Sequence, residues 1–207
     1  MRSMSVRADF GSLLESLNLT GKGAEIGVFK GDFAEIILDH WKGRELLLVD
    51  AWKRLSDYLD SWNLSDAMME QHYQLVRQRM AAHSNRVRIL RMLSLDAART
   101  VTDGSLDFIY VDANHSYRAT LSDLRAWYPK VRPGGLISGH DYFDARADAE
   151  FEPIRSELTQ SLPKEELTSY GVKSAVDEFV GPLNVELLVT EESEPTWYFR
   201  KPGALAA

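Results

Sequence analysis

The chain has 207 residues, of which 44% are hydrophobic and 27% are charged, and this length and composition predict a single globular domain over 1–207. The absence of cysteine excludes disulfides, thiolate metal sites and a cysteine nucleophile. A formal net charge of −7 disfavours a nucleic-acid partner, and with no signal-like segment or apolar stretch of membrane length we expect a cytoplasmic protein without a membrane partner.

Short apolar runs alternate with helix-period patterns along the chain. Apolar residues at helical spacing predict an opening helix from Phe10 to Leu17. Seven apolar runs are typical of buried strands: 24–28, 45–49, 87–90, 106–112, 134–141, 185–189 and 196–200. Helical periodicity recurs between them, over 33–41, 64–80, 117–128 and 172–180. Ser94 is a candidate N-cap for a further helix after the third strand.

The order of these elements predicts one architecture. Strands that alternate with helices form a doubly wound α/β sheet with right-handed crossovers. Residues 190–195 are too few for a helical crossover, so the last two strands should pair antiparallel. We therefore expect a seven-stranded Rossmann-like sheet that is mostly parallel and has an antiparallel terminal strand.

Two segments break the alternation of strands and helices. Residues 51–63 are rich in Trp, Tyr and Asp and show no clear period, and residues 142–170 are polar and contain Pro153 and Pro163. Both are predicted to be excursions or lids beside the binding site. Residues 203–207 are predicted to be a flexible tail.

The loop after the first strand carries the first functional signal. In doubly wound sheets ligands bind beyond the carboxyl ends of the strands, where this loop should lie. A dinucleotide fingerprint needs a second glycine two residues after the first, but the position two after Gly27 is Phe29, a poor neighbour for a pyrophosphate. Glu25 precedes the turn and would attract an ammonium group. A plain packing corner between strand and helix is the alternative.

A second acidic residue follows at the end of the next strand. Asp50 lies 25 residues after Glu25, where a carboxylate can accept hydrogen bonds from both hydroxyls of a ribose. The ligand implied is a nucleoside with a cationic, amino-bearing arm and no phosphates, and S-adenosylmethionine fits this description. Trp52 is placed to cover the adenine ring, with core packing as the alternative.

Four motifs together resemble a known family. The first strand and loop contain acid-x-Gly-x-x-x-Gly as Glu25, Gly27 and Gly31, and Asp50 follows; the later strand ends are "LDFIYVDANHSY" and "VRPGGLISGHDY". Over nearly the whole chain this pattern resembles the class I S-adenosylmethionine-dependent methyltransferases. The last two motifs resemble the small-molecule O-methyltransferase branch, especially the metal-dependent, macrocin-type sugar O-methyltransferases of macrolide and aminocoumarin biosynthesis.

The resemblance implies S-adenosylmethionine as cofactor and a small-molecule or sugar hydroxyl as methyl acceptor. The residues expected to hold the cofactor lie in the first loop and at the strand ends: Glu25, Gly27, Phe29, Gly31, Asp50, Trp52, Ser94 and Asp112. The sequence leaves a homodimer open.

A metal site is the next expectation. Asp112 ends the fourth strand and His140 and Asp141 end the fifth, and these strands are neighbours in the expected fold. Two carboxylates suit Mg²⁺, whereas an imidazole ligand favours Mn²⁺ or a softer ion. Metal-dependent relatives hold the ion with an acid after strand four and an acidic or amide pair after strand five, so His140 departs from the pattern. We expect Asp112, His140 and Asp141 to bind Mg²⁺ or Mn²⁺; the alternatives are that His140 is not a ligand or that no metal binds.

His115 is the candidate general base. It lies three residues past Asp112, and an imidazole can take the proton of an acceptor hydroxyl. In the sugar O-methyltransferases a histidine at this offset has that role, and the alternative is a packing or capping histidine. Three rival functions remain: metal-free methyl transfer to oxygen or nitrogen with His115 or His140 as base, a cofactor-binding scaffold without turnover, and an NAD-binding module, which Phe29 disfavours.

Overall fold

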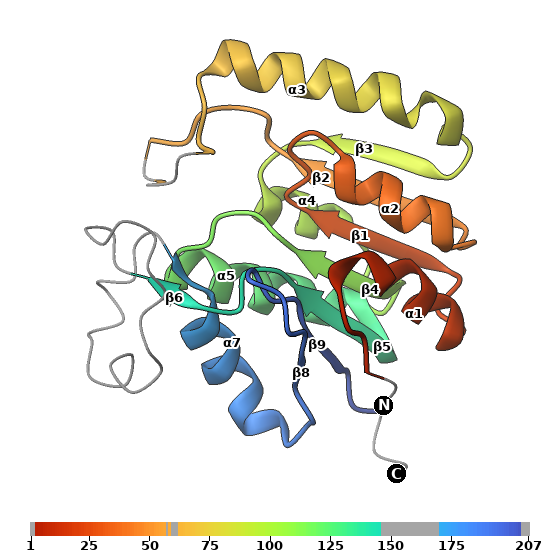
Figure 1. The fold of residues 1–207 in the computed structure, drawn as a ribbon, viewed down its shortest axis with the longest axis vertical. Coiled ribbons are helices and arrows are strands. Elements are labelled where there is room, and N and C mark those ends of the chain that lie inside the picture. Colours follow the sequence, from red (N-terminus) through yellow and green to blue (C-terminus); the bar gives the residue numbers. More distant parts are fainter. Residues whose placement is uncertain (1–2, 57, 59–61, 146–169, 204–207) are drawn as a thin grey trace.

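A central sheet of seven strands organises the structure. The structure is a computed structural model that describes residues 3–56, 58, 62–145 and 170–203 (Figure 1). The strands lie in the spatial order β3, β2, β1, β4, β5, β9, β8. Their bounds are β1 Lys22–Ile26, β2 Glu45–Asp50, β3 Val87–Arg91, β4 Leu106–Val111, β5 Val131–Gly139, β8 Leu188–Val189 and β9 Trp197–Arg200. β1 to β5 are parallel, and β9 runs antiparallel to both β5 and β8, which confirms the predicted sheet.

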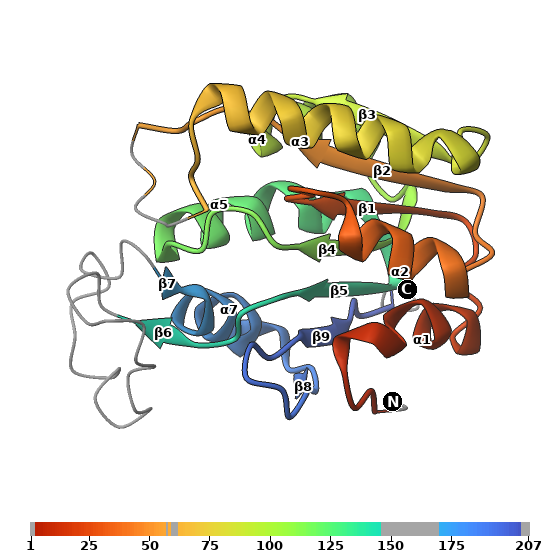
Figure 2. The ribbon, with the colours of Figure 1, turned by 45° about the horizontal axis from the view of Figure 1, so that its top comes forward.

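Helices cover both faces of the sheet (Figure 2). Residues of α1, α2 and α3 pack in one hydrophobic cluster, and residues of α4, α5 and α7 pack in the other. The helix bounds are α1 Phe10–Ser16, α2 Asp32–His40, α3 Asp66–Arg79, α4 Ser94–Thr100, α5 Tyr117–Trp127 and α7 Val172–Val180. Short 3-10 helices are η1 Arg7–Asp9, η2 Met80–His83, η3 Tyr128–Lys130 and η5 Gly181–Leu183.

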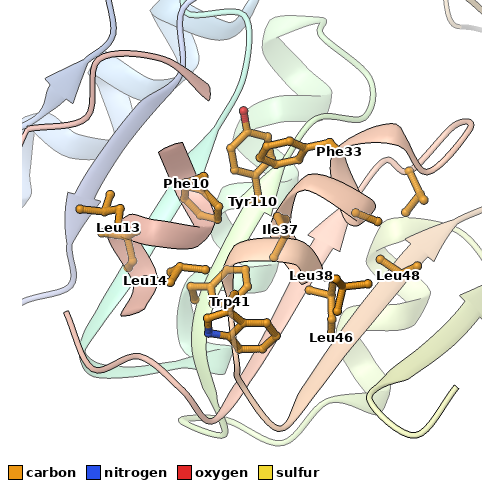
Figure 3. Packing of buried hydrophobic residues seen from close by; sticks show 14 of the residues in the cluster. Phe10, Leu13, Leu14, Phe33, Ile37, Leu38, Trp41, Leu46, Leu48 and Tyr110 are labelled. Carbon is orange, nitrogen blue, oxygen red and sulfur yellow. The ribbon is translucent and has the colours of Figure 1, made fainter. Parts of the chain in front are cut away.

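Successive side chains of a central strand pack alternately in the two hydrophobic clusters. On β2, Leu46 and Leu48 belong to the first cluster, whereas Leu47 and Val49 belong to the second. Since both faces are covered there, Leu46–Val49 of β2 form an apolar run without polar alternation. Figure 3 shows the first cluster, where α1 and α2 bring their apolar side chains onto the sheet around Tyr110.

Several expectations need correction or lie outside the described residues. Ser94 does not cap α4, whose N-cap is Leu93, because its hydroxyl bonds to Asp123 instead. A two-stranded sheet of β6 (Asp144–Ala145) and β7 (Tyr170–Gly171) was not predicted. The predicted lids lie partly outside the described residues, because 57, 59–61 and 146–169 are not described. Residues 204–207 of the predicted tail are not described either. Among the described helices none is long and apolar enough to cross a membrane.

Candidate active site

A cavity of about 1570 Å³ opens at the carboxyl ends of the parallel strands. The loops after β1, β2, β3, β4 and β5 all contribute to its lining. Of the residues that the sequence singled out, those that line it are Glu25, Gly27, Phe29, Asp50, Ser94, Asp112, His115, His140 and Asp141. Because parallel strands end at the same edge of the sheet, residues spread over more than a hundred positions meet here.

The first loop depends on two glycines in left-handed conformations. Gly27 has φ +88°, and a Cβ there would lie 1.8 Å from the backbone oxygen of Asp112. Gly31 has φ +80° and precedes the first residue of α2. Only glycine adopts this backbone region without strain, and only glycine fits so close to β4. The spacing of the motif therefore has a steric cause in this chain.

Asp50 holds the first loop in place. One of its carboxylate oxygens accepts hydrogen bonds from the backbone N–H groups of Val28 at 3.0 Å and Phe29 at 2.9 Å. The other accepts the N–H of Trp52 at 2.7 Å. Only the second oxygen still has room for a further donor, since a carboxylate offers about four lone-pair positions and backbone N–H groups take three of them. Asp50 thus holds the first loop through hydrogen bonds and is also a hydrogen-bond acceptor at the cavity wall.

Trp52 lies in the core. Its side chain is 1% exposed, packs beside Tyr73 with ring centroids 5.1 Å apart, and donates its indole N–H to the Phe29 carbonyl at 2.9 Å. It does not line the cavity. The expectation that it covers an adenine ring is therefore corrected in favour of the packing alternative.

Glu25 is a buried carboxyl group at the floor of the cavity. Its residue is 1% exposed, and its Oε2 has no hydrogen-bond partner among the described residues. Burial raises the pKa of Glu25 well above its usual range, while the charge of Arg7 acts in the opposite direction. An unpaired buried acceptor is rare in proteins and points to a missing donor.

Three acid and histidine side chains meet beside Glu25. The Nε2 of His115 lies 3.3 Å from a carboxylate oxygen of Asp112 and 3.3 Å from one of Asp141. One ligand atom from each of these three residues lies within 4.8 Å of the others, as a metal site requires. Two of the predicted ligands are thus brought together, but the third member is His115 and not His140.

His140 is beside this group but faces another partner. Its Nδ1 lies 3.1 Å from Asp141 and 3.9 Å from Asp112, and both ring nitrogens lie 3.4 Å from the guanidinium of Arg7. His140 thus lies between the guanidinium of Arg7 and the carboxylates of Asp112 and Asp141. Its role as a metal ligand stays a prediction.

Asp112 is held by a cation from the chain itself. Its Oδ2 accepts a hydrogen bond from Nη2 of Arg7 at 2.6 Å. Burial opposes ionisation of this carboxyl group, but Arg7 and the two histidines outweigh it, and the pKa of Asp112 lies well below its usual range. The contact with Arg7 therefore stabilises the ionised form of Asp112.

Aromatic rings flank His115. Its ring is stacked on Tyr170 with centroids 5.1 Å apart and an angle of 19°, and Phe143 stacks on the other side of Tyr170 at 4.9 Å and 20°. Its Nδ1 lies 3.2 Å from the hydroxyl of Tyr58. Tyr58, Phe143 and Tyr170 all line the cavity. Described residues of both predicted lids therefore reach the candidate base.

Ser94 links α4 to α5 and lines the cavity. Its hydroxyl donates to Asp123 at 2.5 Å and accepts the indole N–H of Trp127 at 2.9 Å. Burial raises the pKa of Asp123 to about 7, partly offset by the hydrogen bond from Ser94. The exposed side chains of Leu93 and Leu95 flank this group and offer an apolar surface to a ligand.

Arg7 is the site residue that the sequence did not reveal. It lies in η1, before the first predicted helix, in a polar stretch without periodicity. Its place in the cavity depends on hydrogen bonds to residues more than 180 positions away, so no local pattern marks it.

The comparisons with known proteins match this arrangement. A family model described as "Methyltransferase domain" matches residues 24–142, more than half of the chain. The chain belongs to the methyltransferase-domain family. The matched part of the methyltransferase domain contains every cavity loop from β1 to β5.

Solved structures of similar fold include two methyltransferases and one enzyme with another name. An O-methyltransferase from Bacillus cereus in complex with SAH has a TM-score of 0.62 and 14% identity, covering 94% of this chain and 80% of that one. An O-methyltransferase family protein from Burkholderia thailandensis has a TM-score of 0.61 and 12% identity, covering 95% and 55%. Spermidine synthase from Thermotoga maritima has a TM-score of 0.54 and 12% identity, covering 95% and 60%. At such identities these neighbours show the fold alone.

Curated relatives of the methyltransferase domain are distant. An uncharacterized protein of Acanthamoeba polyphaga mimivirus is 22% identical over 151 residues, which is 70% of this chain and 62% of that protein. A second, from Sinorhizobium fredii, is 30% identical over 70 residues, which is 32% of this chain and 8% of that protein. The chain thus spans less than two thirds of the length of either relative.

Proposed function

We propose that the protein transfers a methyl group from S-adenosylmethionine to a hydroxyl group of a small molecule or sugar. The observation that carries this proposal is a single cavity with two kinds of wall. One wall has the unpaired carboxyl group of Glu25 and the carboxylate of Asp50. The other has Asp112, Asp141 and His115 within contact distance of one another.

The residues of the first wall fit the cofactor. The unpaired Oε2 of Glu25 would accept from the ammonium group of the methionine arm, and Asp50 would accept from a ribose hydroxyl. At Gly27 a Cβ would collide with the backbone of Asp112, so glycine lets the first loop lie against the end of β4 at the cavity. When bound, S-adenosylmethionine supplies an electrophilic methyl group, and the chain must hold the acceptor in line with it.

The residues of the second wall would prepare the acceptor. A hydroxyl group is a weak nucleophile until it loses its proton, and His115 is the imidazole held between two carboxylates at this point. In the neutral ring, the nitrogen that faces the two acceptor-only carboxylates carries the proton, which leaves Nδ1 as the proton acceptor. Asp112 and Asp141 would thus orient the base and stabilise it once it is charged.

The same second wall fits a divalent metal ion. Two carboxylates and one imidazole with ligand atoms within 4.8 Å of one another form a donor set that suits Mn²⁺ and, less well, Mg²⁺. Such an ion would polarise the acceptor oxygen. Metal assistance is therefore an alternative role for Asp112, His115 and Asp141, because a ring nitrogen that binds the ion carries no proton and His115 would then not be the base.

A metal-free methyltransferase that uses a histidine base on oxygen or nitrogen is a second candidate. The salt bridge of 2.6 Å between Arg7 and Asp112 favours it, because the guanidinium already neutralises one carboxylate of the group. A divalent ion would have to share Asp112 with this cation.

Calorimetry with S-adenosylhomocysteine, followed by a turnover assay, tests the proposal. The purified chain is titrated with S-adenosylhomocysteine in EDTA, in Mg²⁺ and in Mn²⁺, and then given methyl-labelled S-adenosylmethionine with panels of sugars, phenols and amines. Binding together with label transfer to a hydroxyl supports the proposal. Binding without transfer to any panel would favour a cofactor-binding scaffold, and no binding under any condition would refute the proposed cofactor.

A further inference from the structure

The N-terminal segment is fastened across the antiparallel end of the sheet. The backbone N–H of Met4 donates to the Tyr198 hydroxyl at 2.7 Å, and the Met4 side chain is buried in the first hydrophobic cluster. The backbone N–H of Arg7 donates to a carboxylate oxygen of Glu192 at 2.7 Å. These contacts fix the direction from which the Arg7 side chain enters the cavity.

The guanidinium of Arg7 is held in a defined orientation. It lies 4.0 Å from the ring centroid of Phe33 and 5.1 Å from that of Tyr110, and it donates to Asp112. Rings on which a guanidinium stacks fix its plane and leave its edges available for hydrogen bonds. Such fixation reduces the entropy lost when a ligand binds to the same group.

Only part of the donor capacity of Arg7 is used. A guanidinium carries five N–H donors, and Asp112 takes one of them at 2.6 Å. The Nε has no hydrogen-bond partner among the described residues, and Nη1 makes only long contacts of 3.4 Å with His140. The side chain lines the cavity and keeps 23% of its surface exposed. Arg7 can therefore bind an anionic group without releasing Asp112.

Arg7 and Glu25 form a complementary pair in the same cavity. The charge of each residue favours the charged form of the other. Each also has a buried polar atom without a hydrogen-bond partner among the described residues. One is a fixed cation with spare donors, and the other is an acceptor that lacks a donor. The ligand that satisfies both at once carries an ammonium and a carboxylate on neighbouring atoms, as the zwitterion of an α-amino acid does.

We propose that Arg7 binds the α-carboxylate of the cofactor's amino-acid arm while Glu25 binds its ammonium group. The inference rests on the proposed function, because it takes the cofactor to be S-adenosylmethionine. It adds a specificity: the site selects a nucleoside with a complete amino-acid arm and rejects analogues whose arm has lost its carboxylate. Arg7 also connects that arm to the acid–histidine group, because it touches Asp112 directly.

The test compares two ligands that differ by one carboxylate. Wild-type protein is titrated calorimetrically with S-adenosylhomocysteine and with its decarboxylated analogue, 5′-deoxy-5′-(3-aminopropylthio)adenosine. We expect S-adenosylhomocysteine to bind about tenfold more tightly or better, as one hydrogen bond to a charged group provides. This comparison needs no variant, so misfolding cannot affect it. A ratio within about threefold would overturn the inference.

Variants then assign the discrimination to Arg7. Arg7→Met should weaken S-adenosylhomocysteine about tenfold or more and the decarboxylated analogue less than about threefold, and Arg7→Lys should recover part of the loss. Arg125→Met on the exposed face of α5 removes the same charge outside the cavity and should change neither affinity. An equal loss for both ligands in Arg7→Met would mean that Arg7 only supports Asp112, and would overturn the inference. Wild-type protein that binds neither ligand would refute the proposed function and this inference with it.

Discussion

His115 is the residue whose surroundings bear most directly on chemistry. Carboxylates of Asp112 and Asp141 contact its Nε2, and the Tyr58 hydroxyl lies 3.2 Å from its Nδ1. Since carboxylates only accept hydrogen bonds, they select the tautomer whose proton is on Nε2. The nitrogen left to accept a proton then faces the hydroxyl of Tyr58, a described residue of the first predicted lid.

Replacement of His115 should separate catalysis from cofactor binding. We expect His115→Ala to lower kcat by about 10²-fold or more, within the usual range for a general base, and to leave the affinity for S-adenosylhomocysteine nearly unchanged. The measurement is methyl transfer to an acceptor found in the panel screen, beside calorimetry. His40→Ala, an exposed histidine at the end of α2, is the matched control. A variant that keeps normal kcat would return His115 to a packing role.

Asp50 has a double role that a single substitution can expose. Its carboxylate fastens the first loop through three backbone N–H groups and is also proposed to accept from the ribose. Asp50→Ala should therefore weaken S-adenosylhomocysteine by more than about 1.5 kcal/mol, the scale of a lost charged hydrogen bond. The decarboxylated analogue should lose as much, because both ligands share the ribose.

Calorimetry with both ligands checks the result for Asp50. The exposed Asp39 of α2 offers the control variant Asp39→Ala, which should bind like the wild type. Unchanged affinity in Asp50→Ala would refute the ribose assignment, and a loss confined to S-adenosylhomocysteine would place Asp50 at the amino-acid arm instead.

At the scale of the elements, hydrophobic period predicted most of the fold. A central strand such as β2 is apolar on both faces because helices cover both, so the run 45–49 is visible without any knowledge of its neighbours. Local chemistry was less informative at helix ends. Ser94 has the residue type of an N-cap, yet its hydroxyl bonds to Asp123 on α5, a contact between two helices that sequence spacing does not encode.

The candidate site was predictable where topology alone places residues. Asp112 and Asp141 come together because β4 and β5 are neighbours in a doubly wound sheet. The choice between His115 and His140 was not predictable, because it depends on which way each ring turns. His140 turns to Arg7, and the backbone of Arg7 is held by Glu192 in the loop between β8 and β9, far away in the sequence.

The contact between α4 and α5 should make stability depend on pH. Burial raises the pKa of Asp123 from 3.8 to about 7, so the folded state prefers the neutral acid. The neutral carboxyl group of Asp123 contributes to the free energy of unfolding below pH 3.8, and this contribution is lost as the pH rises to about 7. At higher pH the group causes no further change in stability. Each pH unit in this window costs up to about 1.4 kcal/mol.

Asp123→Asn removes this titration and so tests it. As the pH rises from 5 to 8, the Tm of the variant should increase relative to that of the wild type, because an amide cannot ionise. This range includes the raised pKa of Asp123 of about 7. Thermal unfolding across this range is the measurement. Asp96→Asn, at an exposed position on α4, should follow the wild type throughout. Parallel curves for Asp123→Asn and wild type would contradict the prediction.

At the scale of the whole molecule, metal removal distinguishes the two proposed mechanisms. If Asp112, His115 and Asp141 bind a divalent ion, EDTA should abolish methyl transfer and leave binding of S-adenosylhomocysteine largely intact. Mn²⁺ should restore at least as much activity as Mg²⁺, because the donor set includes an imidazole. Turnover in the presence and absence of chelator decides the matter. Full activity in EDTA would favour the metal-free candidate.

The cavity includes residues that lie outside the region matched by the family model. The methyltransferase-domain model ends at residue 142, whereas the cavity also involves Arg7 before it and Tyr170 after it. The same fold occurs in a spermidine synthase as well as in O-methyltransferases, so the sheet does not determine the reaction. In this chain the residues outside the matched region are the ones to examine for specificity.

The hydrogen bonds between the N-terminal segment and the C-terminal part of the sheet have a consequence for biosynthesis. Met4 bonds to a residue 194 positions later, and Arg7 to one 185 positions later. A ribosome makes the chain from its N-terminus, so β1 to β5 are complete before either partner exists. A nascent chain can build the parallel part of the sheet while the backbone of Arg7 still lacks its partner Glu192. The proposed carboxylate-binding cation would therefore gain this backbone anchor only after Glu192 is made, and a chain truncated before Glu192 is expected to bind the cofactor more weakly.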